Sequence, residues 1–117
     1  MDISIKDKGN VLIVRMSGEL DISSVPGFKE KVVKKTENDS INYLILNLGG
    51  VSFIDSSGLG AILGRYRYLK KKGGKILLVN LTKQVKKIFT MAGMLKIMDH
   101  FVNEKGALDS ITEGRIA

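Results

Sequence analysis

The sequence predicts an α/β fold: a mixed, mainly parallel sheet of four to five strands, with an N-terminal β-hairpin and about four helices. Two observations lead to this prediction. Apolar runs of strand length alternate with segments whose apolar residues recur at helical spacing. The run at 43–48 is apolar at nearly every position, as in a strand covered on both faces. With 117 residues the chain has room for one such domain, expected to span residues 1–117.

The hairpin comes first. Ile3 and Ile5 alternate with polar residues, and turn-forming residues at 7–10 precede an apolar run at 11–16. A helix should follow, because Ser23 and Ser24 offer an N-cap, Pro26 fits a first turn, and apolar residues recur at helical spacing to about residue 36.

The strand at 43–48 should occupy a central, parallel position. A second helix, beginning near Ser57 or Gly58, carries an apolar stripe and should end at the glycine pair 73–74. The stripe consists of Leu59, Ile62, Leu63, Tyr66 and Leu69. The run at 75–79 predicts the next strand.

Two further helices are predicted in the C-terminal part. Thr82 can cap the first, and Gly93 lies where the end of that helix would require a positive φ. The short apolar run at 95–98 indicates an edge strand. Asn103 can cap a final helix that ends near Gly114.

Composition narrows the classes of function. The net charge of +7 comes from lysines and arginines on predicted helix faces, which favours an acidic protein partner over nucleic acid. No cysteine is present, and no apolar stretch approaches the ~20 residues of a membrane span. We therefore expect a cytoplasmic protein that is a monomer when free, binds no membrane or nucleic acid, and needs no cofactor or metal.

The segment 51–60 joins the buried strand to the start of the second helix, and in open α/β sheets this end of a strand is where sites are built. A helix N-terminus has unpaired N–H groups and a partial positive charge, so a phosphate attached there would be stabilised. We expect Ser56 to be exposed in this turn.

Small residues continue along one face of this helix, at Ser57, Gly60, Ala61 and Gly64. They allow two interpretations that the residues alone do not separate. Asp55, Ser56 and Ser57 can act simply as N-cap residues, and glycines can serve tight helix packing. However, each glycine destabilises a helix by ~1 kcal/mol relative to alanine, which favours a surface that another protein approaches closely.

Several segments occur here in a characteristic order: Ser-Gly-Glu-Leu-Asp at 17–21, the strand at 44–48, Ser-Phe-Ile-Asp-Ser-Ser-Gly-Leu-Gly at 52–60, and the helical segments 62–66 and 85–89. In this order they resemble the STAS domain family over essentially the whole chain, and within it the anti-sigma factor antagonists of sporulation. Residues 22–26 depart from the family pattern, which bears on partner selectivity.

The resemblance implies a partner-switching cycle and no enzymatic activity. The unphosphorylated antagonist binds an anti-sigma factor that is also a serine kinase and releases a sigma factor, sigma-F in sporulation. That kinase phosphorylates the first serine after the aspartate, which is Ser56 here, and a serine phosphatase restores the active form. Asp21 is expected close to Ser56. The expected partner-binding residues are Asp21, Asp55, Ser57, Gly58, Leu59, Gly60 and Gly64.

Three alternatives remain. A serine hydrolase would use Ser56 as nucleophile, but Gly-x-Ser-x-Gly is absent and His100 is the only histidine. A nucleotide-binding loop would use the glycines at 58, 60 and 64, but their spacing departs from Gly-x-Gly-x-x-Gly. The third is a nucleotide-sensing or interaction module of the same family without a phosphorylation switch.

Overall fold

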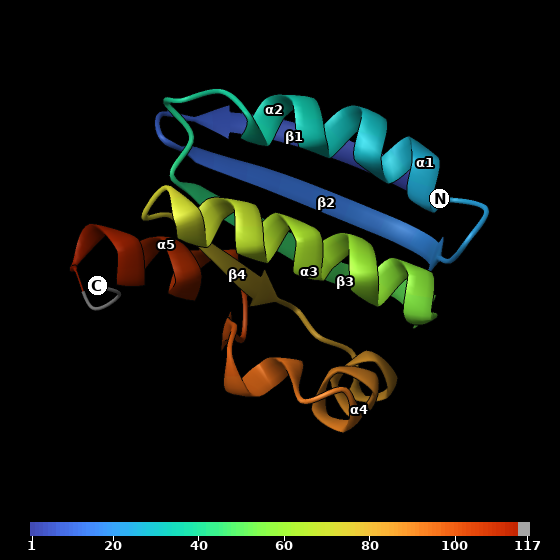
Figure 1. Ribbon diagram of the computed structural model, residues 1–117. Coiled ribbons are helices and arrows are strands. Elements are labelled where there is room, and N and C mark those ends of the chain that lie inside the picture. Colours follow the sequence, from blue (N-terminus) through green and yellow to red (C-terminus); the bar gives the residue numbers. More distant parts are fainter. Residues whose placement is uncertain (115–117) are drawn as a thin grey trace.

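The computed structural model describes residues 1–114; residues 115–117, the last three of the predicted domain, lie outside the described part. Within these residues five strands form one sheet in the order β1-β2-β3-β4-β5 (Figure 1). β1 and β2 run antiparallel and the other pairs are parallel, which confirms the predicted mixed, mainly parallel sheet. The strands are β1 (Asp2–Lys8), β2 (Val11–Leu20), β3 (Tyr43–Ile54), β4 (Lys75–Val79) and β5 (Asp99–Phe101).

The helices connect the parallel strands and follow the last one. They are α1 (Val25–Phe28), the π-helical turn η1 (Lys29–Val33), α2 (Lys34–Thr36), α3 (Ser56–Lys71), α4 (Lys83–Met91), the 3₁₀ turn η2 (Met94–Lys96) and α5 (Glu104–Thr112). α1, η1 and α2 follow one another without a break, so they form the single helix predicted to end near residue 36.

The predicted capping role of Ser24 is wrong in one respect. Ser24 precedes α1, but its side chain makes no cap hydrogen bond. Its hydroxyl instead donates to the carbonyl of Glu19 at 2.8 Å and accepts the N–H of Asp21 at 2.9 Å. Ser24 therefore fixes the loop that leaves β2, because its hydroxyl is already engaged there by Glu19 and Asp21.

β3 is longer than the predicted strand at 43–48 and continues to Ile54. Its first part lies between β2 and β4, whereas its last part pairs with β2 alone. Gly50 allows this pairing, because a Cβ at that position would lie 2.7 Å from the Cβ of Ser17 on β2. The extension places the end of β3 beyond the end of β4, and α3 begins there.

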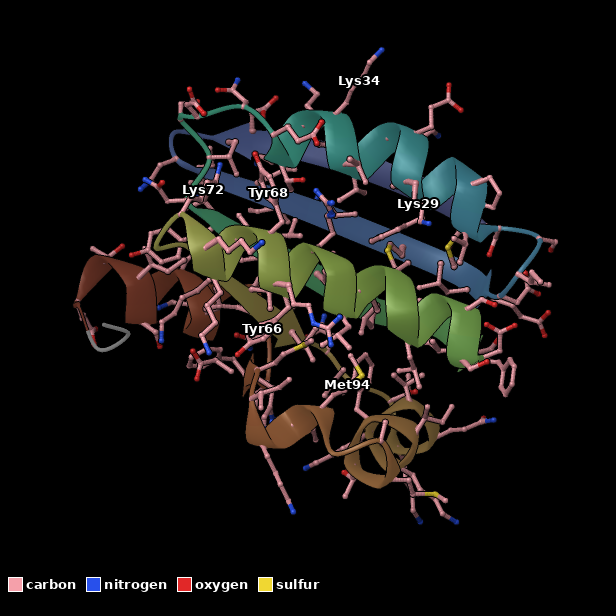
Figure 2. All side chains as sticks on the ribbon, viewed as in Figure 1. Lys29, Lys34, Tyr66, Tyr68, Lys72 and Met94 are labelled. Atoms are coloured by element: carbon pink, nitrogen blue, oxygen red, sulfur yellow. The ribbon has the colours of Figure 1, made fainter. Side chains whose placement is uncertain are left out.

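The predicted edge strand at 95–98 is wrong. Gly93, with φ of 72°, turns the chain out of α4 into η2, and the edge strand is β5, which pairs with β4. The side chains of Met94 and Met98 are buried in the same apolar core as α1, α3 and α4. Figure 2 labels Met94. The apolar character of this segment therefore reflects packing of an irregular turn, which is indistinguishable from a short strand in the sequence.

The sheet carries an apolar core on each face. The larger core lies between the sheet and α1, α3 and α4, and includes the fully buried Phe28, Ile62 and Phe89. The smaller one lies under α5 and includes Ala107. Because α3 is held against the sheet along its buried stripe, its N-terminal end stays in a fixed position at the end of β3 (Figure 1).

Candidate functional site

Asp55 fixes the N-terminal end of α3 by binding two segments at once. Its Oδ1 accepts the N–H of Gly58 at 2.9 Å, which makes Asp55 the N-cap of the helix. Its Oδ2 accepts the N–H of Ile22, in the loop after β2, at 3.1 Å. The Asp55 N–H in turn donates to the carbonyl of Leu20 at 3.2 Å. The loop after β2 is thereby tied to the start of α3.

Asp21 organises that loop. Its Oδ1 accepts the hydroxyl of Ser23 at 2.7 Å, the N–H of Ser23 at 3.0 Å and the N–H of Ser24 at 3.1 Å. These hydrogen bonds, the one from the Ser23 hydroxyl above all, lower the pKa of Asp21. The Asp55–Ile22 hydrogen bond ties this anionic loop to the start of α3. That Asp21 lies close to Ser56 itself stays a prediction.

Ser56 is the first residue of α3 and is exposed, as the sequence led us to expect. The helix begins slightly before the predicted start near Ser57 or Gly58, because Asp55 is its cap. Ser57 is half-buried. A phosphate on the Ser56 hydroxyl would lie at a helix N-terminus, where the helix dipole favours an anion. The hydroxyl is accessible to another protein.

Packing within the domain requires a glycine at position 58. Gly58 is buried, and a Cβ there would collide with the carbonyl oxygen of Leu20 and lie 2.8 Å from Cγ2 of Ile54. The close approach of α3 to the end of β2 therefore depends on the missing side chain. This packing role accounts for Gly58 without any phosphate-binding loop.

Gly60 and Gly64 differ from Gly58, because a Cβ at either position would meet no heavy atom within 4 Å apart from its chain neighbours and the adjoining backbone of α3. Gly60 is exposed and Gly64 is half-buried, so the packing of this chain requires a glycine at neither. The proposed face of small residues needs one correction: Ala61 is buried, because it lies on the core side of the helix. Leu59 is half-buried and packs against the same core.

Two exposed apolar side chains near this helix end were missed in the sequence. Ile22 is 75% exposed in the loop tied to Asp55, and Phe53 is 41% exposed near the end of β3. The strand pattern could not reveal Phe53, since a register irregularity between Gly18 and Glu19 of β2 breaks the alternation of inward and outward side chains there. Both residues add apolar surface beside Ser56.

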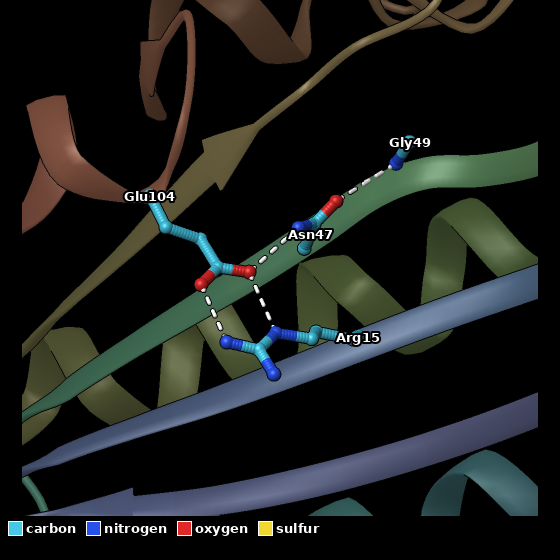
Figure 3. A network of polar contacts seen from close by, with 4 residues as sticks. All are labelled: Arg15, Asn47, Gly49 and Glu104. Atoms are coloured by element: carbon cyan, nitrogen blue, oxygen red, sulfur yellow. Dashed lines mark hydrogen bonds and ion pairs between the residues drawn. The ribbon is translucent and has the colours of Figure 1, made fainter.

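A second polar cluster, also missed, lies on the other face of the sheet (Figure 3). Glu104, the first residue of α5, accepts two hydrogen bonds of 2.9 Å from Arg15 of β2 and one of 2.6 Å from the amide of Asn47 of β3. The Asn47 Oδ1 accepts the N–H of Gly49 at 3.0 Å. The hydrogen bond from Arg15 is the main reason that the pKa of Glu104 falls from 4.5 to about 2.

The described residues outside these clusters suggest no catalytic or metal-binding site. His100 lies on β5 opposite Leu78, whereas Ser56 follows β3 two strands away. Among residues 1–114, no group of three or more His, Cys, Asp or Glu side chains could hold a metal ion. None of the helices in this described part is long and apolar enough to cross a membrane.

Comparison with known proteins gives a consistent result. The family model of the STAS domain matches residues 2–107. An anti-sigma F factor antagonist of Paenibacillus polymyxa is 34% identical over 111 residues, covering 95% of each chain. An anti-sigma-B factor antagonist of Bacillus subtilis is 32% identical over 108 residues, covering 92% of this chain and 97% of the relative.

Solved structures of the anti-sigma factor antagonist SpoIIAA share the fold. The unphosphorylated form superposes with a TM-score of 0.77 at 26% identity, covering 95% of this chain and 98% of SpoIIAA. The phosphorylated form, from Bacillus, gives 0.75 at 28% identity, covering 94% of this chain and 99% of SpoIIAA.

Proposed function

The chain belongs to the STAS domain family, and from this premise we propose that it is an anti-sigma factor antagonist controlled by phosphorylation of Ser56. In its unphosphorylated form it binds an anti-sigma factor that is a serine kinase, and the sigma factor is released. The kinase then phosphorylates Ser56 and ends the interaction. A serine phosphatase removes the phosphate and starts the cycle again.

The exposed position of Ser56 at the start of α3 is the observation that carries this proposal. A kinase must reach the acceptor hydroxyl, and the fold must tolerate the product. Both conditions are met at a capped helix N-terminus, because the hydroxyl lies in solvent and the helix dipole offsets up to ~2 kcal/mol of the added repulsion from nearby carboxylates. The phosphate can therefore form without rearranging the domain.

The effect of the phosphate arises in the complex. It adds about 1.5 to 2 negative charges at neutral pH. A partner surface that fits a hydroxyl would have to bury these charges without matching donors, at several kcal/mol. The hydroxyl form binds, and the phosphate form does not.

The proposed contact surface surrounds Ser56. Exposed Gly60 and half-buried Gly64 let a partner backbone approach α3 closely, and Ile22 and Phe53 supply apolar area. The carboxylates of Asp21 and Asp55 hold the loop and the helix start in place. The proposed partner-binding residues are Asp21, Asp55, Ser57, Leu59, Gly60 and Gly64, together with Ile22 and Phe53. Gly58 was also expected to bind the partner, but it is buried and serves the packing of α3 against β2.

The proposal also covers the sigma factor, the cellular location and the oligomeric state. We take sigma-F as the sigma factor released, on the resemblance to the sporulation branch, although a relative acting on anti-sigma-B is nearly as similar. The domain spans residues 1–117, acts in the cytoplasm where sigma factors work, and is a monomer when free. Light scattering of the purified chain checks the last point.

Phosphorylation by the anti-sigma kinase of the same organism tests the switch. The chain is incubated with that kinase and ATP, and the modified residue is located by mass spectrometry. We expect phosphate on Ser56 in the natural chain and in the matched control Ser57→Ala, and none in Ser56→Ala. The Ser56→Ala variant should still bind the kinase and release sigma-F permanently.

Two outcomes contradict the proposal. Phosphate on Ser57 in the Ser56→Ala variant, with none on Ser56 in the natural chain, would move the acceptor. Binding without any phosphorylation would leave an interaction module that lacks the switch. The same assay with the sigma-B kinase in place of the sigma-F kinase decides which sigma factor is served.

A bulky residue on the outward face of α3 tests the contact surface. Leucine at position 64 adds volume where the structure leaves open space, so Gly64→Leu should fold normally but bind the kinase weakly. Circular dichroism confirms the fold, and calorimetry measures affinity. Unchanged affinity in a folded variant would place the interface elsewhere.

A further inference from the structure

The excess of positive over negative charge lies in one part of this chain. Of its 19 lysines and arginines, ten lie in residues 56–98, a segment without a single aspartate or glutamate. The remaining nine are outnumbered by the chain's 12 acidic residues. The net charge of +7 therefore arises entirely from α3, β4, α4 and η2. An acidic molecule would be attracted to this part of the surface.

Some cations on α3 and at its C-cap are engaged within the domain. Arg65 donates from Nη1 to the hydroxyl of Thr36 at 3.1 Å, and its guanidinium lies 5.0 Å from the ring centroid of Tyr68. Lys72 donates to the carbonyls of Thr36 and Asn38, both at 3.1 Å, and lies 5.4 Å from the same ring (Figure 2). These side chains join α3 to α2 and are not available to a partner.

Arg67 and Lys71 are exposed, and within the described residues 1–114 neither forms an ion pair. They lie four positions apart on one helix face, where like charges repel each other. Their face also carries Gly60 and Gly64, because positions 60, 64, 67 and 71 follow helical spacing. At 1.5 Å per residue, Arg67 lies ~16 Å and Lys71 ~22 Å along the axis from Ser56.

We infer that Arg67 and Lys71 bind a cluster of carboxylates on the anti-sigma kinase and thereby accelerate its association. This inference rests on the proposed function, since it extends the same contact surface along α3. A protein that covers Ser56, Gly60 and Gly64 continues directly onto these two cations. That continuity favours the kinase over a lipid surface or a nucleic acid, because either would bind the basic segment without reference to Ser56.

Charge reversal with a matched control tests the inference. The variant Arg67→Glu/Lys71→Glu is compared with Lys8→Glu/Lys34→Glu, which changes the net charge equally on exposed residues of β1 and α2. Figure 2 shows Lys34 pointing away from α3. Circular dichroism and urea unfolding confirm that both variants fold. Association with the kinase is measured by stopped flow at low and at physiological salt.

We expect the α3 variant to associate about tenfold more slowly at low salt, with a smaller salt dependence. Its dissociation rate should change little, and KM for Ser56 phosphorylation should rise while kcat stays constant, because both residues are remote from the acceptor. The control should behave like the natural chain.

Equal association rates for the two variants would overturn the inference while leaving the proposed function intact, provided that the natural chain is phosphorylated on Ser56. The inference would also fail if the α3 variant lost binding to phosphatidylserine vesicles or duplex DNA but associated normally with the kinase. A natural chain that neither binds nor is phosphorylated would overturn both.

Discussion

The N-terminal ends of α3 and α5 have the same capping geometry but serve different roles. In each helix the cap side chain accepts the N–H of a glycine three residues later at 2.9 Å: Asp55 from Gly58, and Asn103 from Gly106. The first helical residue then differs. Glu104 faces the sheet, where Arg15 and Asn47 satisfy its carboxylate, whereas Ser56 faces solvent.

This difference shows that a helix N-terminus does not define a functional site by itself. At α5 the polar groups complete one another's hydrogen bonds, so the cluster fixes the helix to β2 and β3 (Figure 3). At α3 the cap completes the backbone hydrogen bonds and leaves an exposed hydroxyl. If the first helical residue faces the sheet, its side chain stabilises the fold. If it faces solvent, its side chain is available to another protein.

The largest expected effect is on binding at the α3 end. Phosphorylated Ser56 should bind the kinase about a thousandfold more weakly than the free hydroxyl, because several kcal/mol of phosphate desolvation are not compensated and each ~1.4 kcal/mol is tenfold. Amide NMR spectra of the two forms should differ only around Asp21 and residues 56–60. Shifts spread across β3 and β4 would instead show a global conformational change.

A smaller effect, on the free energy of unfolding, should distinguish the two glycines whose N–H groups bind the N-cap side chains, Gly58 and Gly106. Gly58→Ala should destabilise the domain by about 2 to 3 kcal/mol, because the new methyl group collides with the backbone of Leu20. Gly106→Ala is the matched control: its Cβ would lie 3.5 Å from Asn103 Oδ1, an ordinary contact, so stability should stay level or rise by up to ~1 kcal/mol. Urea denaturation measures both, and equal losses would refute the packing role of Gly58.

The α5 cluster should make stability depend on acid pH. The lowered pKa of Glu104, about 2 against 4.5, means that its contribution is complete above pH 4.5 and is lost as pH falls towards 2. Arg15 is 49% exposed, so solvent screens the pair and the stability lost is only a fraction of what the difference in pKa alone would give. The Glu104→Gln variant should be destabilised at pH 7 and show a flatter decline below pH 4.5. A decline as steep as that of the natural chain would assign the acid sensitivity to other carboxylates.

The smallest effect is expected from the neighbouring ion pair on α5. Lys105 and Asp109 are 2.7 Å apart, but Lys105 is 83% exposed, so water competes for both charges. Asp109→Asn should leave the melting temperature unchanged within error. A clear decrease would mean that the surface of α5 contributes as much as the cluster beneath it.

Features that depend on neighbouring residues in the chain could be predicted before the structure was known. Thr82 and Asn103 cap α4 and α5 as predicted, accepting the N–H groups of Val85 and Gly106, and Gly93 has the positive φ expected after α4. The order of strands and helices, and the exposure of Ser56 between a buried strand and an amphipathic helix, also followed from local patterns.

Features that depend on residues distant in the chain are visible only in the folded domain. β3 continues past its glycines because β2 pairs with it, and 95–98 is no strand because its methionines pack into the core. Gly58 is needed for an approach to Leu20, and Arg15 meets Glu104 across 89 residues. A local pattern cannot contain these contacts, because each arises only when the sheet brings separate segments within a few ångströms of one another.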